Sequence, residues 1–151
     1  MAPKNVRMIC MLGSMFLYII SLIPECYCAP QCVSSFAALL VGWMGLYSLG
    51  ASLSWLANPA IWLAWMYLKR KPKRALGFAI AATLLAASFL LFDEVVTNEA
   101  GHMGRIISYK AGYWLWLSSM VFMLGGSIVV LFSKNKEEHL HHHNQKKIHH
   151  H

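Results

Sequence analysis

Residues 53–65 read LSWLANPAIWLAW, and the interpretation of the fold depends on this stretch. It is apolar and aromatic, yet Asn58 and Pro59 stand at its centre. Proline fits the first turn of a helix, where its missing N–H is not needed, and asparagine is a favoured N-cap residue. Two interpretations follow: a helix begins near Asn58, or one tilted helix that starts near residue 52 is kinked at Pro59.

The composition indicates that the chain lies in a membrane. Of its 151 residues, 58% are hydrophobic and only 13% are charged, whereas soluble domains carry about a quarter charged residues. The charges are bunched, so long stretches meet the requirement of roughly 20 apolar residues for a spanning helix. No alternating strand pattern is evident. The sequence therefore predicts an all-α integral membrane protein, a four-helix bundle with the lipid bilayer as its solvent.

Three predicted spans cover residues 8–24, 74–92 and 113–132. The uncharged interval 33–68 is harder to place, because one helix of that length would measure about 54 Å and the hydrocarbon core is only about 30 Å thick. We expect a broken or kinked segment, with a re-entrant or interfacial helix at 34–49 before a single span at 52–68. The polytopic membrane domain is then 1–133, followed by a polar, His-rich tail at 134–151.

Lysine and arginine residues mark the ends of the apolar stretches and set the orientation. Lys4 and Arg7 precede the first span, KRKPKR fills residues 69–74, and further lysines follow the last span. By the positive-inside rule these ends face the cytoplasm. The prediction is a multi-pass protein of the bacterial inner membrane with both termini cytoplasmic, and nucleic acid is not an expected partner. An open alternative is that residues 1–28 are a signal peptide cleaved before Ala29.

Three cysteines, Cys26, Cys28 and Cys32, lie in the stretch ECYCAPQC just outside the first span. An extracytoplasmic compartment is oxidising, so a disulfide is expected there. We favour Cys26–Cys32, because Cys26–Cys28 would close a very tight ring. Free thiols or a soft-metal site are open alternatives. Quinone-linked thiol oxidases also combine four spans with external cysteines, but they need a second pair, and residues 93–112 contain no cysteine.

The outer loop FDEVVTNEAGHMG at 92–104 is the most site-like polar stretch. Carboxylates beside a histidine could do acid–base work or bind a cation, or they could form an ordinary hydrated loop. The tail holds seven of the eight histidines, and we interpret it as a tag remnant or a native tail, without function or fixed structure. The candidate binding residues from the broken stretch and this loop are Trp55, Asn58, Pro59, Asp93, Glu94, Glu99 and His102.

Several short motifs resemble those of a group of uncharacterised small bacterial four-span membrane proteins. The resemblance covers most of residues 21–132. It implies the same membrane fold, brings no known activity, and does not include the cysteine cluster or the histidine-rich tail. The motifs are SLIP at 21–24, GWMGL at 42–46, WLANP at 55–59, NEAG at 98–101 and GYWLW at 112–116.

The function expected from these features is non-enzymatic. No motif for a nucleophile elbow, a phosphate loop or a zinc-protease helix is present, and no cofactor is expected. We expect a small accessory or binding protein that packs against another membrane protein or acts through its outer loops. The alternatives are a membrane thiol redox protein using Cys26, Cys28 and Cys32, an immunity protein against a membrane-acting toxin, and a carrier that passes a small solute at Asn58.

Overall fold

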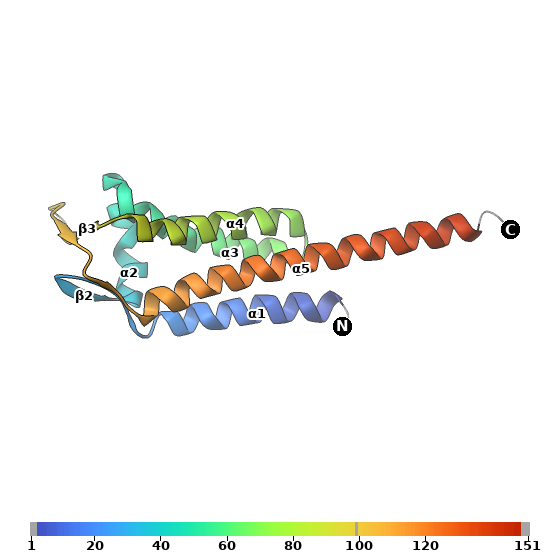
Figure 1. Ribbon diagram of the computed structural model, residues 1–151, viewed down its shortest axis with the longest axis horizontal. Coiled ribbons are helices and arrows are strands. Elements are labelled where there is room, and N and C mark those ends of the chain that lie inside the picture. Colours follow the sequence, from blue (N-terminus) through green and yellow to red (C-terminus); the bar gives the residue numbers. More distant parts are fainter. Residues whose placement is uncertain (1–2, 99, 149–151) are drawn as a thin grey trace.

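Four helices lie side by side and form an elongated bundle (Figure 1). The computed structural model describes residues 3–98 and 100–148. Helix α5 packs along both α1 and α4, and α3 packs along α4. Neighbouring helices run in opposite directions along the chain, so the bundle is antiparallel. The four helices are α1 (Pro3–Ser21), α3 (Ala57–Leu68), α4 (Pro72–Ser88) and α5 (Ala111–Ile148).

Short helices and strands cover one end of this bundle, and we call them the cap (residues 22–56 and 89–110). Strands β2, β1 and β5 form one small sheet, and β3 and β4 form a hairpin. The prediction of an all-α fold was wrong here, because strands of two to five residues are too short to show alternation in the sequence. The cap elements are β1 (Glu25–Ala29), β2 (Gln31–Ser34), α2 (Ser35–Val41), η1 (Gly42–Ser48), η2 (Gly50–Leu56), η3 (Phe89–Leu91), β3 (Glu94–Val96), β4 (Met103–Arg105) and β5 (Ser108–Tyr109).

The chain breaks at Leu49 and Gly50, between the predicted segments 34–49 and 52–68. Both residues have a positive φ, 56° and 62°, which a bulky leucine adopts only when its surroundings require it. The 3-10 helix η2 then continues into α3 without an intervening loop. The N-cap position of α3 is occupied by Leu56, so the prediction that Asn58 is the N-cap was wrong. Pro59 does lie in the first turn, where a missing N–H is tolerated.

Small side chains hold α4 against its neighbours. Ala75, Ala79, Ala82 and Ala86 recur at helical spacing and are all fully buried in the main core. Methyl side chains let membrane helices approach closely, which increases dispersion contacts along their length. Gly77, on the same helix, is exposed, and nothing lies within 4 Å of a Cβ added to it.

Helices α1 and α5 approach each other through glycines. A Cβ added to Gly126 would lie 2.5 Å from Cβ of Cys10, and one added to Gly13 would lie 2.6 Å from the Phe122 ring. Larger residues at either glycine would push the helices apart. Cys10 therefore acts as a small packing residue in this interface.

Large apolar side chains cover the outside of the bundle. Within the described residues, two helices are long and apolar enough to cross a membrane, Pro72–Leu91 and Ala111–Lys136. Helices α1 and α3 also expose apolar residues. A soluble monomer rarely exposes so continuous an apolar surface. The exposed side chains include Met8, Ile9, Leu12, Phe16 and Ile19 on α1, Trp62 and Met66 on α3, Ile80 and Leu84 on α4, and Val121, Phe122, Ile128, Val129 and Phe132 on α5.

Most of the basic side chains lie at the end of the bundle opposite the cap, whereas Arg105 and Lys110 lie in the cap. The basic end holds the start of α1, the α3–α4 connection and the later part of α5 (Figure 1). Arg7 donates a hydrogen bond of 3.4 Å to the backbone oxygen of Lys69, which joins α1 to the end of α3. Helix α5 continues to Ile148, so the tail prediction of no fixed structure was wrong over residues 134–148. Residues 149–151 lie outside the described part of the chain.

Candidate functional site

A cavity of about 440 Å³ lies between the cap and the end of the bundle. Its walls come from β1, β2, α2, η1, η2, β3 and the adjoining ends of α1, α3 and α5. Ligand-binding cavities commonly have volumes of about 300–1,000 Å³. The cavity therefore has the size of a small-molecule site.

Aromatic and aliphatic side chains form most of the cavity wall. Tyr27, Trp55, Phe89, Tyr113 and Trp116 all contribute. No Asp, Glu, Lys, Arg or His is present among the described residues that line it. A pocket of this kind favours an apolar, uncharged occupant, because an isolated charge loses its hydration without gaining a counter-charge.

Asn58 lies at the floor of the cavity and joins three helices. Its Oδ1 accepts hydrogen bonds from the Tyr18 hydroxyl and from Nε1 of Trp116, each 2.9 Å long. Its Nδ2 donates to the backbone oxygen of Trp55 at 3.0 Å. Both donors to Oδ1 are thereby satisfied in an apolar setting, where an unpaired donor is costly. The carboxamide in the opening stretch is therefore a structural junction as well as part of the cavity floor.

Trp55 fixes the position of α2 over the cavity. Its Nε1 donates to the backbone oxygen of Leu39 at 2.9 Å. Its ring lies so close to Gly42 that an added Cβ would come within 2.5 Å of Cδ1. The hydrogen bond and this close approach, both at the five-membered ring of the indole, hold η2 against the α2–η1 segment.

Ser35 and Cys26 contribute the neutral polar groups on the opposite wall. Ser35 is 7% exposed, and its hydroxyl makes no hydrogen bond that satisfies normal geometry. Burial raises the pKa of the Cys26 thiol to about 11, an effect that the nearby Ser35 hydroxyl partly offsets. Cys26 is therefore a protonated thiol at neutral pH, and a thiol is a weak partner for a hydroxyl.

Sequence reasoning missed Ser35, and no local pattern singles it out. Its neighbour Ser34 is recognisable, since a serine just before an apolar run is a typical N-cap. Ser34 does fill this role for α2, accepting a hydrogen bond of 3.2 Å from the N–H of Ala37. The position of the Ser35 side chain depends instead on how α2 meets α5, where the hydroxyl lies directly against Gly112.

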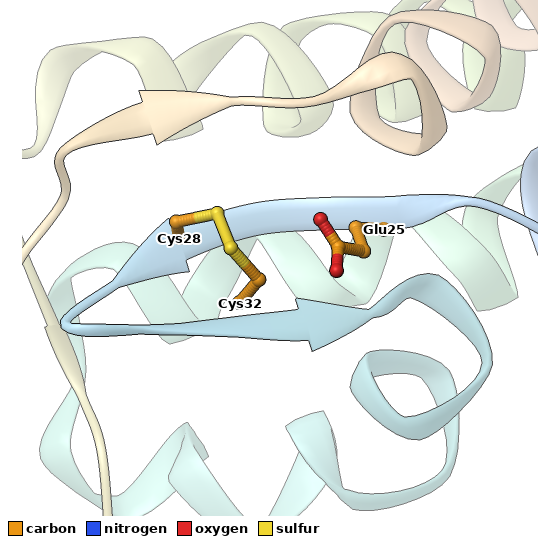
Figure 2. A group of neighbouring side chains, drawn as sticks. All are labelled: Glu25, Cys28 and Cys32. Carbon is orange, nitrogen blue, oxygen red and sulfur yellow. A yellow bond between two sulfur atoms is a disulfide. The ribbon is translucent and has the colours of Figure 1, made fainter.

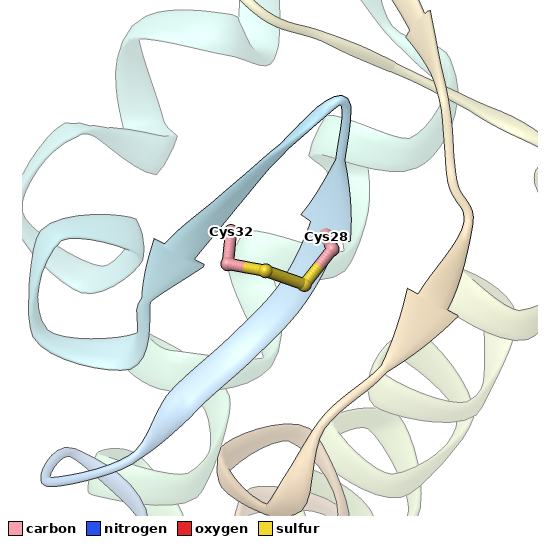
Figure 3. The surroundings of a disulfide bond; sticks show 2 residues. All are labelled: Cys28 and Cys32. Atoms are coloured by element: carbon pink, nitrogen blue, oxygen red, sulfur yellow. A yellow bond between two sulfur atoms is a disulfide. The ribbon is translucent and has the colours of Figure 1, made fainter.

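The disulfide joins Cys28 to Cys32 across the β1–β2 hairpin (Figure 3). The two residues are direct partners in the antiparallel ladder, with Cα atoms 3.9 Å apart. The predicted Cys26–Cys32 pairing was wrong, and Cys26 is free. Spacing alone could not reveal the hairpin, whose turn at Pro30 brings Cys28 opposite Cys32.

Glu25 lies beside this disulfide on the same hairpin (Figure 2). A carboxylate oxygen of Glu25 and the two sulfur atoms lie within 4.8 Å of one another. Metal ions bind cysteine as the thiolate, whereas these sulfur atoms are joined to each other. The cluster could hold a soft metal ion only after the disulfide is reduced.

The acidic loop forms the β3–β4 hairpin, and its polar groups close the turn. Glu94 is paired with Arg105 in the ladder. Oδ1 of Asn98 accepts a hydrogen bond from the His102 N–H and lies 3.1 Å from its Nδ1. The backbone oxygen of Asp93 accepts from the N–H of Ile106. His102 and the described carboxylates thus occupy opposite ends of the hairpin.

The predicted site residues separate into two groups. Trp55 and Asn58 line the cavity, whereas Pro59 does not. Asp93, Glu94 and His102 are exposed on the β3–β4 hairpin, and Glu99 lies outside the described residues. Comparisons with protein-family models, curated proteins and solved structures find no match for this chain.

Proposed function

We propose that this chain is a four-span membrane protein that binds a small, mainly apolar molecule in the cavity beneath its cap. The cavity carries the proposal, because it combines an apolar wall with a few neutral polar groups. Such a site can bind and orient a molecule, and it offers no ionised group for acid–base chemistry. The role is therefore non-enzymatic, either as a binding protein or as an accessory subunit of a membrane partner.

The lengths of the helices support four crossings. Helix α1 has 19 residues, which corresponds to about 29 Å at the α-helical rise. Helix α3 alone is short, but η2 and α3 have 7 and 12 residues, which together give about 32 Å of helix. Both values match a hydrocarbon core of about 30 Å. The continuous helical segments Pro72–Leu91 and Ala111–Lys136 complete the set.

The charges support an orientation in the bacterial inner membrane. The basic end of the bundle would face the cytoplasm by the positive-inside rule. The cap apart from η2, with its disulfide, would then face the oxidising compartment, where disulfides persist. Both ends of the chain would lie on the cytoplasmic side.

Orientation can be tested with two cysteine reporters, each introduced into a chain whose free cysteines, Cys10 and Cys26, are replaced by serine. Met103→Cys lies on the β3–β4 hairpin, and Lys71→Cys lies between α3 and α4; both positions are exposed. A membrane-impermeant maleimide added to intact spheroplasts should label Met103→Cys and should reach Lys71→Cys only after permeabilisation. The opposite pattern, or labelling of both from outside, contradicts the proposed topology.

Binding can be tested by filling the cavity. Ala38 lines it, whereas Leu40, on the same helix, is 55% exposed. The protein is extracted into a mild detergent, and native mass spectrometry records the small molecules retained. We expect Ala38→Phe to lose a bound apolar molecule that the native chain and Leu40→Phe retain. Equal retention by all three chains, or none by the native chain, would overturn the binding role.

A redox function makes a different prediction, which concerns the state of the disulfide in the cell. If the Cys28–Cys32 disulfide took part in turnover, membranes should contain reduced and oxidised protein in proportions that change with the quinone pool. Trapping free thiols with an alkylating reagent before lysis measures this proportion. We expect the disulfide to stay oxidised whether the quinone pool is oxidised or reduced, as a structural crosslink would.

A further inference from the structure

We infer that the basic end of the bundle binds the phosphate head group of an anionic phospholipid. The site consists of residues 69–74, KRKPKR, which we call the basic turn, together with Arg7 of α1. The basic turn connects α3 to α4 and includes the start of α4. The inference rests on the membrane placement proposed above and is independent of the cavity.

The first observation is the density of positive charge on one tight turn. Five of the six residues in the basic turn are Lys or Arg, and all five side chains are exposed. The backbone N–H groups of Arg70 and Lys71 donate to the backbone oxygen of Tyr67, at 3.1 Å and 2.8 Å. Arg7 reaches the same turn through its hydrogen bond to a backbone oxygen there. Cations from two separate parts of the chain are therefore held at one place.

The second observation is the lack of a counter-charge from three of the four helices. The sequence has no Asp or Glu at residues 1–24 or 26–92, so α1, α3 and α4 bring no carboxylate to this end. Helix α5 carries Glu137 and Glu138 just after Lys136. Like charges placed close together repel one another, and an anion from outside the chain would relieve that repulsion.

The third observation is the start of α4. Lys71 occupies its N-cap position without a side-chain cap hydrogen bond, and its first turn contains no acidic residue. The first turn of a helix carries a partial positive charge, which Asp or Glu there offsets. Lys73 and Arg74 lie in this turn instead. The helix end thus adds to the positive potential of the basic turn, and a phosphate oxygen could accept from its uncapped N–H groups.

The neighbouring apolar surface favours a lipid over a soluble anion. Met66 on α3, just before the basic turn, is 70% exposed, and Met8, next to Arg7, is 51% exposed. Exposed cations hold a free ion weakly, because water and salt screen them. A phospholipid is already anchored by its acyl chains, which would lie along these apolar side chains, and its phosphate lies at the membrane surface.

The test compares two lipids with the same acyl chains and different net charge, phosphatidylglycerol and phosphatidylcholine. Each is titrated into the full chain in a mild non-ionic detergent, and native mass spectrometry measures the bound lipid. The turn variant, Lys71→Gln/Lys73→Gln, removes two charges from the basic turn and leaves the other three to keep the orientation. The cap variant, Arg105→Gln/Lys110→Gln, is the matched control, because it removes the same charge from the cap.

The native chain should bind phosphatidylglycerol at least about tenfold more tightly than phosphatidylcholine. The turn variant should weaken phosphatidylglycerol binding by about 10- to 30-fold, at about fivefold for each basic side chain, and Arg7→Gln by about fivefold. The cap variant should bind as the native chain does. Equal binding of the two lipids, or equal losses in the turn and cap variants, would overturn the inference. Unchanged binding in Arg7→Gln would overturn the part assigned to α1.

Two further measurements separate the basic end from other sites. Ala38→Phe, with its cavity filled, should retain phosphatidylglycerol; loss of the lipid would place it in the cavity and overturn the inference. Inorganic phosphate at constant ionic strength should not displace the lipid, and displacement would assign the basic turn to a soluble anion. Failure of the membrane placement has its own readout, since Lys71→Cys would then be labelled by maleimide from outside the cell membrane.

Discussion

The two ends of the bundle are built in different ways. Towards the basic end, a repeat of small residues on α4 packs directly against α3 and α5, and the helices leave little space between them. At the cap, single residues make the decisive contacts: the Asn58 junction, the Trp55 indole and the close approach at Gly112. Regular packing closes a core efficiently. Irregular backbone held at a few points can leave a cavity, and the candidate site lies there.

An aromatic cluster marks the boundary between these two regions. The Phe89 ring lies 5.4 Å from the ring of Tyr27, 5.8 Å from that of Tyr109 and 5.6 Å from that of Tyr113. Tyr113 also donates a hydrogen bond of 3.0 Å to the backbone oxygen of Ala86. Large aromatic side chains thus take the place of the small alanines of α4 at the point where the cap begins. The following changes test whether the two regions depend on such different contacts.

The largest effect should come from Gly112→Ala. The added Cβ would collide with the Ser35 hydroxyl and would lie 2.6 Å from the backbone oxygen of Glu25. Because a backbone atom cannot move aside easily, we expect a loss of about 3 kcal/mol in the free energy of unfolding. Gly125→Ala, in the same helix, meets nothing within 4 Å and should be neutral or stabilising by less than about 1 kcal/mol. Unfolding in mixed micelles, followed by circular dichroism, measures both.

Asn58→Leu should cause a similar loss in the free energy of unfolding. The substitution leaves the Tyr18 hydroxyl and Nε1 of Trp116 without their acceptor, at a cost of about 2–4 kcal/mol for the pair. Tyr18→Phe removes one donor and keeps the Asn58–Trp116 bond, so its cost should be about 1 kcal/mol. The same unfolding assay applies. If the two variants are equally stable, the three-helix junction is not what holds the cap to the bundle.

Loss of the disulfide should have a smaller effect. The bridge closes a loop of only five residues, Cys28 to Cys32, and the loop-entropy model gives about 2 kcal/mol for a ring of this size. Cys28→Ser is the test variant, and Cys26→Ser is the control because Cys26 is free. The difference between the two should disappear when the Cys26→Ser chain, which keeps the disulfide, is reduced. A persistent difference would mean that serine at position 28 disturbs packing in its own right.

The smallest effect concerns the reactivity of Cys26. Since burial raises its pKa from 9.0 to about 11, the reactive thiolate should be scarce at pH 8 and should increase by about tenfold per pH unit until the pH approaches 11. In the unfolded chain the increase should end near pH 9. Alkylation followed by mass spectrometry of the Cys26 peptide gives both profiles. Coincident profiles would show that the thiol is not buried against Ser35.

The apolar stretches and the placement of charges predicted most of the helical regions correctly. Residues 74–92 correspond closely to α4 and η3, and the break in the interval 33–68 lies at Leu49–Gly50, between the predicted segments 34–49 and 52–68. The cavity could not be predicted, because its wall comes from segments far apart in the sequence. Ser35 and Trp116, for example, are ordinary residues until α2 and α5 are brought together.

The sequence by itself determined the apolar helices, the basic ends and the need for a break, because periodicity, charge and length are local properties. Only the tertiary structure decided the partner of each cysteine, the role of Asn58 and the existence of the cavity. A disulfide follows from strand register, and hydrogen-bond partners follow from which helices cross at a given depth. A cavity follows from the space that packed elements leave unfilled, and no single segment contains that information.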